Sequence, residues 1–181
     1  MRFASAALAA FLLAACSPEY NWREVRSIEH GYLVMLPGKP ASMTRRILLE
    51  ETEVPMTMQG ARVNETSFTV AVATLPDDRQ VTREKAQAAM RAGMVRNVGG
   101  TERSADAREV TVVDASGAAQ GRVPGVRVEA GGSVQGKAMS MLAGFTSRGT
   151  RAYQWVVVGP DIRREEALTF LDSFRLLRTE P

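Results

Sequence analysis

Hydrophobic and polar residues alternate along most of the chain, in short runs separated by turn-forming residues. Alternation with a period of two is typical of strands with one buried face, and clusters of Pro, Gly and Asp are typical of turns. This pattern predicts eight strands, at residues 31–36, 43–50, 54–63, 67–75, 108–113, 123–130, 137–147 and 151–159. The last two form the clearest hairpin, with its turn at Arg148-Gly149-Thr150.

The period changes to that of a helix in two places. A first helix is expected from Thr82 to Gly99-Gly100, with an inner stripe of Ala86, Met90, Gly93, Met94 and Asn97. A second is expected after Asp161, with a stripe of Ala167, Leu168, Leu171 and Phe174. Helices after the fourth and eighth strands predict an α+β fold, in which two helices cover a mostly antiparallel sheet.

The first sixteen residues are typical of an export signal. Arg2 is followed by eleven uncharged residues, too few to span a membrane. They lead into Leu13-Ala14-Ala15-Cys16, which resembles the bacterial lipobox. The resemblance implies cleavage before Cys16 and acylation of its thiol and new amine. We therefore expect a signal peptide at 1–15, a lipidated tether at 16–27 and one domain at 28–178.

Several segments together resemble the PsbP-like fold. They are Leu36-Pro37-Gly38-Lys39-Pro40 after a strand, Leu75-Pro76-Asp77 before a helix, and Phe170-Leu171-Asp172-Ser173-Phe174 in the last helix. That fold occurs in the photosystem subunit PsbP and in bacterial lipoproteins of the DcrB type. The resemblance implies an α/β/α sandwich with a central antiparallel sheet. It implies no reaction, because most members of this fold bind or assemble other molecules.

The composition of the chain limits the kinds of chemical site that it can form. The chain has 181 residues, a net charge of +3, one cysteine and one histidine. A single cysteine excludes an internal disulfide and a multi-cysteine zinc site. The basic residues are scattered among acids without stacking aromatics, so nucleic acid is not an expected partner.

The candidate acid–base groups have ordinary structural explanations. His30 is expected at a strand end, with Glu29 pointing to the other face. Glu50, Glu51 and Glu53 are expected as solvated charges around a turn, and Asp77-Asp78 as turn formers. We expect no catalytic residue and no cofactor, although an enzyme with an unrecognised site stays open.

Methionine is the unusual feature. Two pairs sit at i, i+2, so each pair shares one face of a strand: Met56 with Met58, and Met139 with Met141. Thioethers bind Cu(I), which makes these residues candidate metal ligands. Methionine is also a common core filler, which we expect here.

These observations predict a non-catalytic binding or assembly lipoprotein in the envelope of a Gram-negative bacterium, with copper handling as the alternative. The predicted partners are membrane lipid through Cys16 and an unidentified envelope protein. Ser17 favours the outer membrane, because an Asp after the lipidated cysteine is the usual signal for inner-membrane retention. Recognition is expected on glycine-rich loops at 99–100, 117–125 and 131–136.

Overall fold

The computed structural model describes residues 19–49 and 51–178. Cys16, the lipobox and the signal peptide lie outside the described residues. The described chain forms one ten-stranded sheet and two helices. In chain order these are β1 (Arg23–Ser27), β2 (Tyr32–Leu36), β3 (Ala41–Leu49), β4 (Thr52–Val63), β5 (Thr66–Thr74), α1 (Gln80–Asn97), β6 (Gly100–Val113), β7 (Ala119–Val134), β8 (Lys137–Arg148), β9 (Arg151–Gly159), α2 (Arg164–Ser173) and β10 (Arg175–Leu177).

The sheet has the strand order β1-β2-β10-β6-β7-β8-β9-β5-β4-β3. Neighbouring strands are antiparallel, apart from the parallel pair β10 and β6. The chain thus builds a meander from β6 to β9 in the middle, and two hairpins, β1–β2 and β3–β4, at the ends. The hairpin β8–β9 turns at Gly149, whose φ of 56° is a left-handed conformation that glycine adopts without strain.

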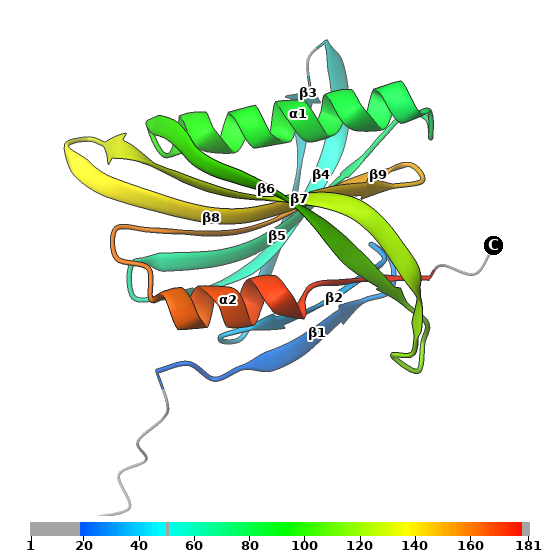
Figure 1. Ribbon diagram of the computed structural model, residues 1–181, viewed down its shortest axis with the longest axis horizontal. Helices are drawn as coiled ribbons and strands as arrows, with labels where there is room; N and C mark the ends of the chain where they lie inside the picture. Colours follow the sequence, from blue (N-terminus) through cyan, green and yellow to red (C-terminus); the bar gives the residue numbers. More distant parts are fainter. Residues whose placement is uncertain (1–18, 50, 179–181) are drawn as a thin grey trace, which may run out of the picture.

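The predicted α/β/α sandwich is wrong. Strands make up 59% of the structure and helices 18%, and the sheet curls into a half-barrel (Figure 1). The physical reason is strand length: β6 has 14 residues and β7 has 16, about twice the predicted lengths. Twist accumulates along such strands, and a register shift between Glu102 and Ser104 adds to it. Two helices of 18 and 10 residues are too small to form layers over so large a sheet.

The helices pack on opposite faces of the central strands. On β5, Phe68, Val70 and Val72 face the core that contains α2, whereas Ala71 and Ala73 face the core that contains α1. On this strand, large residues thus face α2 and small residues face α1.

The core around α2 is held by aromatic residues. Phe174 stacks on Trp155 with their ring centroids 4.1 Å apart, and the Trp155 indole N–H donates to the Leu171 carbonyl oxygen at 3.1 Å. Tyr20 and Trp22 pack edge-on against Phe68, at 6.2 and 6.0 Å between centroids. The segment expected as a tether is thus part of the domain from Tyr20 onward, and its residues Arg23–Ser27 form the edge strand β1.

Candidate binding groove

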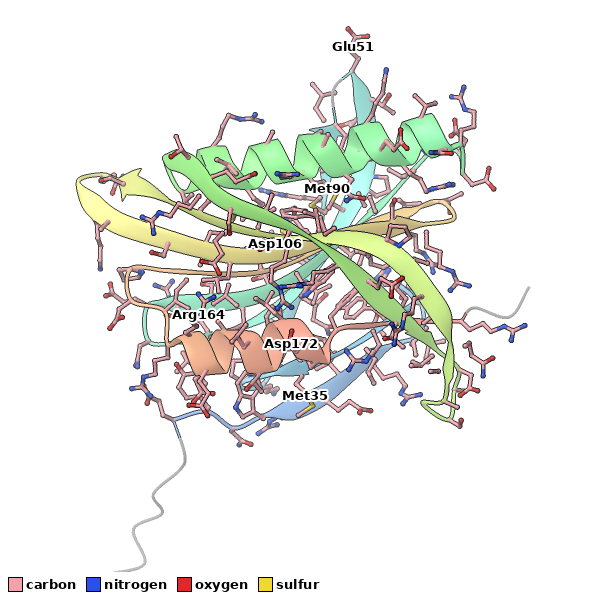
Figure 2. The ribbon with its side chains drawn as sticks, in the orientation of Figure 1. Met35, Glu51, Met90, Asp106, Arg164 and Asp172 are labelled. Carbon is pink, nitrogen blue, oxygen red and sulfur yellow. The ribbon has the colours of Figure 1, made fainter. Side chains whose placement is uncertain are left out.

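An open groove of about 390 Å³ lies between α1 and the β3–β4 end of the curled sheet. Its floor comes from β3, β4, β5 and β9, and its other wall is the sheet-facing side of α1. We call it the methionine groove, because Met56, Met58, Met90 and Met94 all line it. In Figure 2, Met90 lies beneath α1, on its sheet side, and Glu51 marks the outer tip of the β3–β4 hairpin.

Local sequence periodicity brings the four methionines together. Met56 and Met58 are two residues apart on β4 and so point to the same face of the sheet. Met90 and Met94 are four residues apart on α1 and so lie on one side of the helix. Met56 and Met90 are buried, whereas Met58 and Met94 are half-buried. The groove therefore has a dry inner end and a flexible thioether surface that a ligand can reach.

One buried polar side chain faces this apolar surface. Gln154 on β9 is 8% exposed, lines the groove and makes no hydrogen bond with any of the described residues. Ser67 and Thr69 on β5 also line the groove, so hydroxyl groups lie on the same part of its floor. The amide atoms of Gln154 are not enclosed by protein, so they open to the groove and can bond to water or to a ligand.

Among the described residues, the charged side chains that line the groove are all cationic. Its lining includes the exposed guanidinium groups of Arg45 and Arg96 and, among the described residues, no Asp or Glu. Neither arginine forms an ion pair or side-chain hydrogen bond within 19–49 and 51–178. Their neighbours differ in this respect: Arg46 pairs with Glu53 at 2.9 Å, and Arg91 pairs with Glu102. The groove is therefore apolar inside and cationic at its edge.

A larger cleft of about 660 Å³ adjoins the groove under the N-terminal half of α1 and shares Leu49 with it. Its lining includes Glu51, Arg79 and Lys85. Charged side chains of both signs keep such a surface hydrated. The methionine groove is the better candidate, because apolar walls with a few polar groups are typical of ligand sites.

The predicted candidate residues lie elsewhere. His30 is half-buried in the turn before β2, where its backbone carbonyl accepts a hydrogen bond from the Tyr153 hydroxyl at 3.1 Å. Glu51 and Glu53 are exposed at the β3–β4 turn, and Glu50 lies outside the described residues. The structure does not bring these groups together with one another or with the groove.

Asp77 and Asp78 lie in the turn before α1. The Asp77 carboxylate accepts hydrogen bonds from the Arg79 backbone N–H at 3.0 Å and from its Nε at 2.9 Å. The Arg79 side chain is the main cause that lowers the pKa of Asp77 to about 2, with a further contribution from the Thr82 side chain. This carboxylate orders the start of the helix.

The two predicted methionine pairs are far apart. Met139 and Met141 lie on β8, and two strands separate β8 from β4. Three inter-strand spacings of ~4.8 Å separate β8 from β4, roughly 14 Å measured along the sheet, so the two pairs are not neighbours in it. Met58 instead neighbours Met90 and Met94 across the groove. Among the described residues, no cluster of three or more His, Cys, Asp or Glu side chains could hold a metal.

The expectation of glycine-rich recognition loops is wrong for most of these glycines. Gly100 begins β6, while Gly131 and Gly132 lie within β7 and pair with 100–101. A Cβ atom at Gly100 would lie 2.0 Å from the Gly131 carbonyl oxygen. These glycines are needed because two backbones meet closely, not because a loop must move.

Sequence reasoning missed Gln154, Arg45 and Arg96 as site residues. Met90 and Met94 were expected on the inner stripe of the first helix, and Met56 and Met58 on one strand face. The missing information was that α1 lies beside β4, which depends on the curl of the whole sheet.

No protein-family model matches the chain, and no curated protein matches it. In the part of the chain that the structure describes, neither helix is long and apolar enough to cross a membrane. The groove must therefore be interpreted from its own chemistry.

Proposed function

We propose that this protein is a lipid-anchored envelope protein that binds an apolar ligand in the methionine groove and catalyses no reaction. The observation that carries the proposal is the groove itself: four methionines line it, and the Gln154 amide in its floor has no hydrogen-bond partner among the described residues. Methionine surfaces adapt to apolar ligands of different shape. A few polar groups then orient the ligand.

The anchor part of the proposal rests on the lipobox at Leu13–Cys16. Acylation of Cys16 would fix the protein to a membrane, and Ser17 favours the outer membrane, facing the periplasm. The packing of Tyr20 on Phe68 shortens the expected tether. Four residues from Cys16 to Tyr20 reach at most roughly 14 Å, so the domain would lie directly at the lipid surface.

A non-catalytic role agrees with the position of the titratable groups. Among the described residues, no ion pair or side-chain hydrogen bond joins His30 to an acid, and the groove lining includes no acid or histidine. General acid–base catalysis requires such groups within hydrogen-bond reach of a substrate. Binding requires only the apolar walls, the amide and the cationic edge.

The anchor is tested by fractionating cells that express wild type or Cys16→Ala. We expect wild type in the membrane fraction with an acylated Cys16, and Cys16→Ala as unprocessed precursor or released protein. A Ser17→Asp variant serves as the control for sorting, because it keeps the acylated cysteine. Membrane-bound wild type with a free Cys16 thiol would refute the anchor.

The groove is tested with Nile red, an uncharged apolar dye that fluoresces in dry surroundings. Gly93 lines the groove from α1, and a Cβ atom there would meet only the Arg96 guanidinium, at 3.8 Å. Gly93→Trp should therefore fill the groove without distorting the helix. We expect it to weaken Nile red binding at least tenfold.

Ala92→Trp is the matched control, because Ala92 is exposed on α1 and does not line the groove. It should leave Nile red binding unchanged. Equal binding by both variants would place the dye elsewhere and refute the groove as the binding site.

A further inference from the structure

The geometry points to a free fatty acid, a single alkyl chain with a carboxylate head, as the occupant of the methionine groove. This inference rests on the proposed function and names its ligand class. Three features carry it: the size of the groove, the presence of unpaired polar groups in its lining, and the sign of its charge.

The size fits one alkyl chain of moderate length. At ~30 Å³ for each water-sized group, a volume of about 390 Å³ holds about thirteen such groups. The walls that would contact the chain are Met58, Met94, Ile47 and Val158, all partly buried and apolar. Leu48, which is 68% exposed, extends the apolar surface to the rim. An alkyl chain would cover this rim, which otherwise faces water.

The unpaired polar groups fit a carboxylate. Arg45 and Arg96 are cations without a partner among the described residues, and both line the groove. Guanidinium groups bind carboxylates through charge-assisted, often bidentate, hydrogen bonds. The Gln154 amide, which lines the same groove and has no hydrogen-bond partner among the described residues, is an additional donor. A fatty acid supplies acceptors to these donors and apolar groups to the methionines.

The charge disfavours the other amphiphiles. A cationic amphiphile would meet two arginines and, in the described lining, no acid. A neutral alkyl alcohol would fill the apolar walls but would leave the guanidinium groups unpaired. The groove should therefore rank ligands of equal chain length in the order carboxylate, alcohol, amine.

The experiment measures displacement of Nile red by laurate, dodecanol and dodecylamine, which share a twelve-carbon chain. We expect laurate to bind at least tenfold more tightly than dodecanol, and dodecylamine to bind most weakly. In Arg45→Gln and Arg96→Gln, the ratio of laurate affinity to dodecanol affinity should fall, by roughly tenfold for a charge-assisted hydrogen bond. Arg46→Gln is the control, because Arg46 pairs with Glu53 and does not line the groove.

Each other outcome has a separate meaning. If Nile red binds the groove but laurate binds no better than dodecanol, the fatty-acid inference is overturned and the proposed apolar site stands. If Gly93→Trp fails to weaken Nile red binding, the proposed site itself fails. Binding to anionic phospholipid vesicles but not to laurate would mean that the two arginines bind a membrane surface instead of a fatty acid. A dimer that Gly93→Trp dissociates would make a second copy the occupant. Both of these results would overturn the inference.

Discussion

Truncation of Leu171 to alanine tests how α2 is seated on the sheet. Leu171 is 2% exposed and lies in the core formed by α2 and the inner faces of β2, β5 and β9. Its backbone carbonyl accepts the Trp155 indole N–H, and alanine keeps that hydrogen bond. The substitution therefore removes side-chain packing alone.

The expected cost follows from complete burial. Truncations of buried Leu to Ala cost about 2–5 kcal/mol, made up of lost transfer free energy and a residual cavity. The aromatic side chains of Phe170, Phe174 and Trp155 surround this core and resist collapse into the cavity. We therefore expect a value in the upper half of that range. Urea denaturation monitored by tryptophan fluorescence would measure the free energy of unfolding.

Leu168→Ala is the matched control, because Leu168 is on the same helix but half-buried. A half-buried leucine should cost about 1 kcal/mol when truncated. Equal losses for Leu168→Ala and Leu171→Ala, or a loss below about 0.5 kcal/mol for Leu171→Ala, would refute the seating of α2 described above.

Three further perturbations have defined outcomes. The Arg79 side chain is the main cause that lowers the pKa of Asp77 to about 2, so the Asp77 carboxylate stabilises the fold above pH 4 and loses this effect as the pH falls toward 2. Asp77→Asn should therefore reduce the change in the urea midpoint between pH 4 and pH 2. An unchanged pH profile in this variant would contradict the expectation. A Cβ atom at Gly144 would lie 2.1 Å from Trp155 Cζ2, so Gly144→Ala should cost roughly 1–3 kcal/mol in thermal or urea unfolding, and a neutral effect would mean that the indole ring moves freely. Cu(I) titration against a chelator should reveal no tight site, whereas tight binding that is lost in Met58→Leu would favour the copper alternative.

The parts of the fold that the sequence predicted well are those with strong local signals. The hairpin β8–β9 is bounded by a glycine turn, and both strands follow the expected ranges within a residue or two. Residues 54–63 and 67–75 were also expected as neighbouring strands and form most of β4 and β5. In each case the apolar pattern, the turn chemistry and the strand length agree.

The parts of the fold that the sequence did not predict depend on contacts between residues that are far apart in the chain. The first half of β6, around 101–107, is mostly exposed, so it has no apolar alternation to detect. It is a strand because β7 pairs with it, and the two strands supply each other's hydrogen bonds. The three residues of β10 are likewise ordered by β2 on one side and β6 on the other. These additions lengthen and widen the sheet, and the sandwich prediction fails for that reason.

The stripe on α2 shows the same limit at the level of single residues. Leu168 was expected to face the sheet, yet it is half-buried, while Phe170 is fully buried. A ten-residue helix in a curled sheet is contacted from two sides, by β2 and by β8 and β9. Its buried arc is wider than one stripe, and periodicity alone does not reveal this.

The curl of the sheet, which the sequence did not predict, also shapes the candidate site. In the curled sheet, β3 and β4 run behind α1 and cross it (Figure 1), and α1 contacts β8 and β9 more extensively than β3. The groove on the β4 side leaves Met58 and Met94 only half-buried, and the Gln154 amide there has no hydrogen-bond partner among the described residues. A ligand that bridges α1 and β4 would therefore bind where the fold lacks its own packing, and should raise the melting temperature of wild type but not of Gly93→Trp.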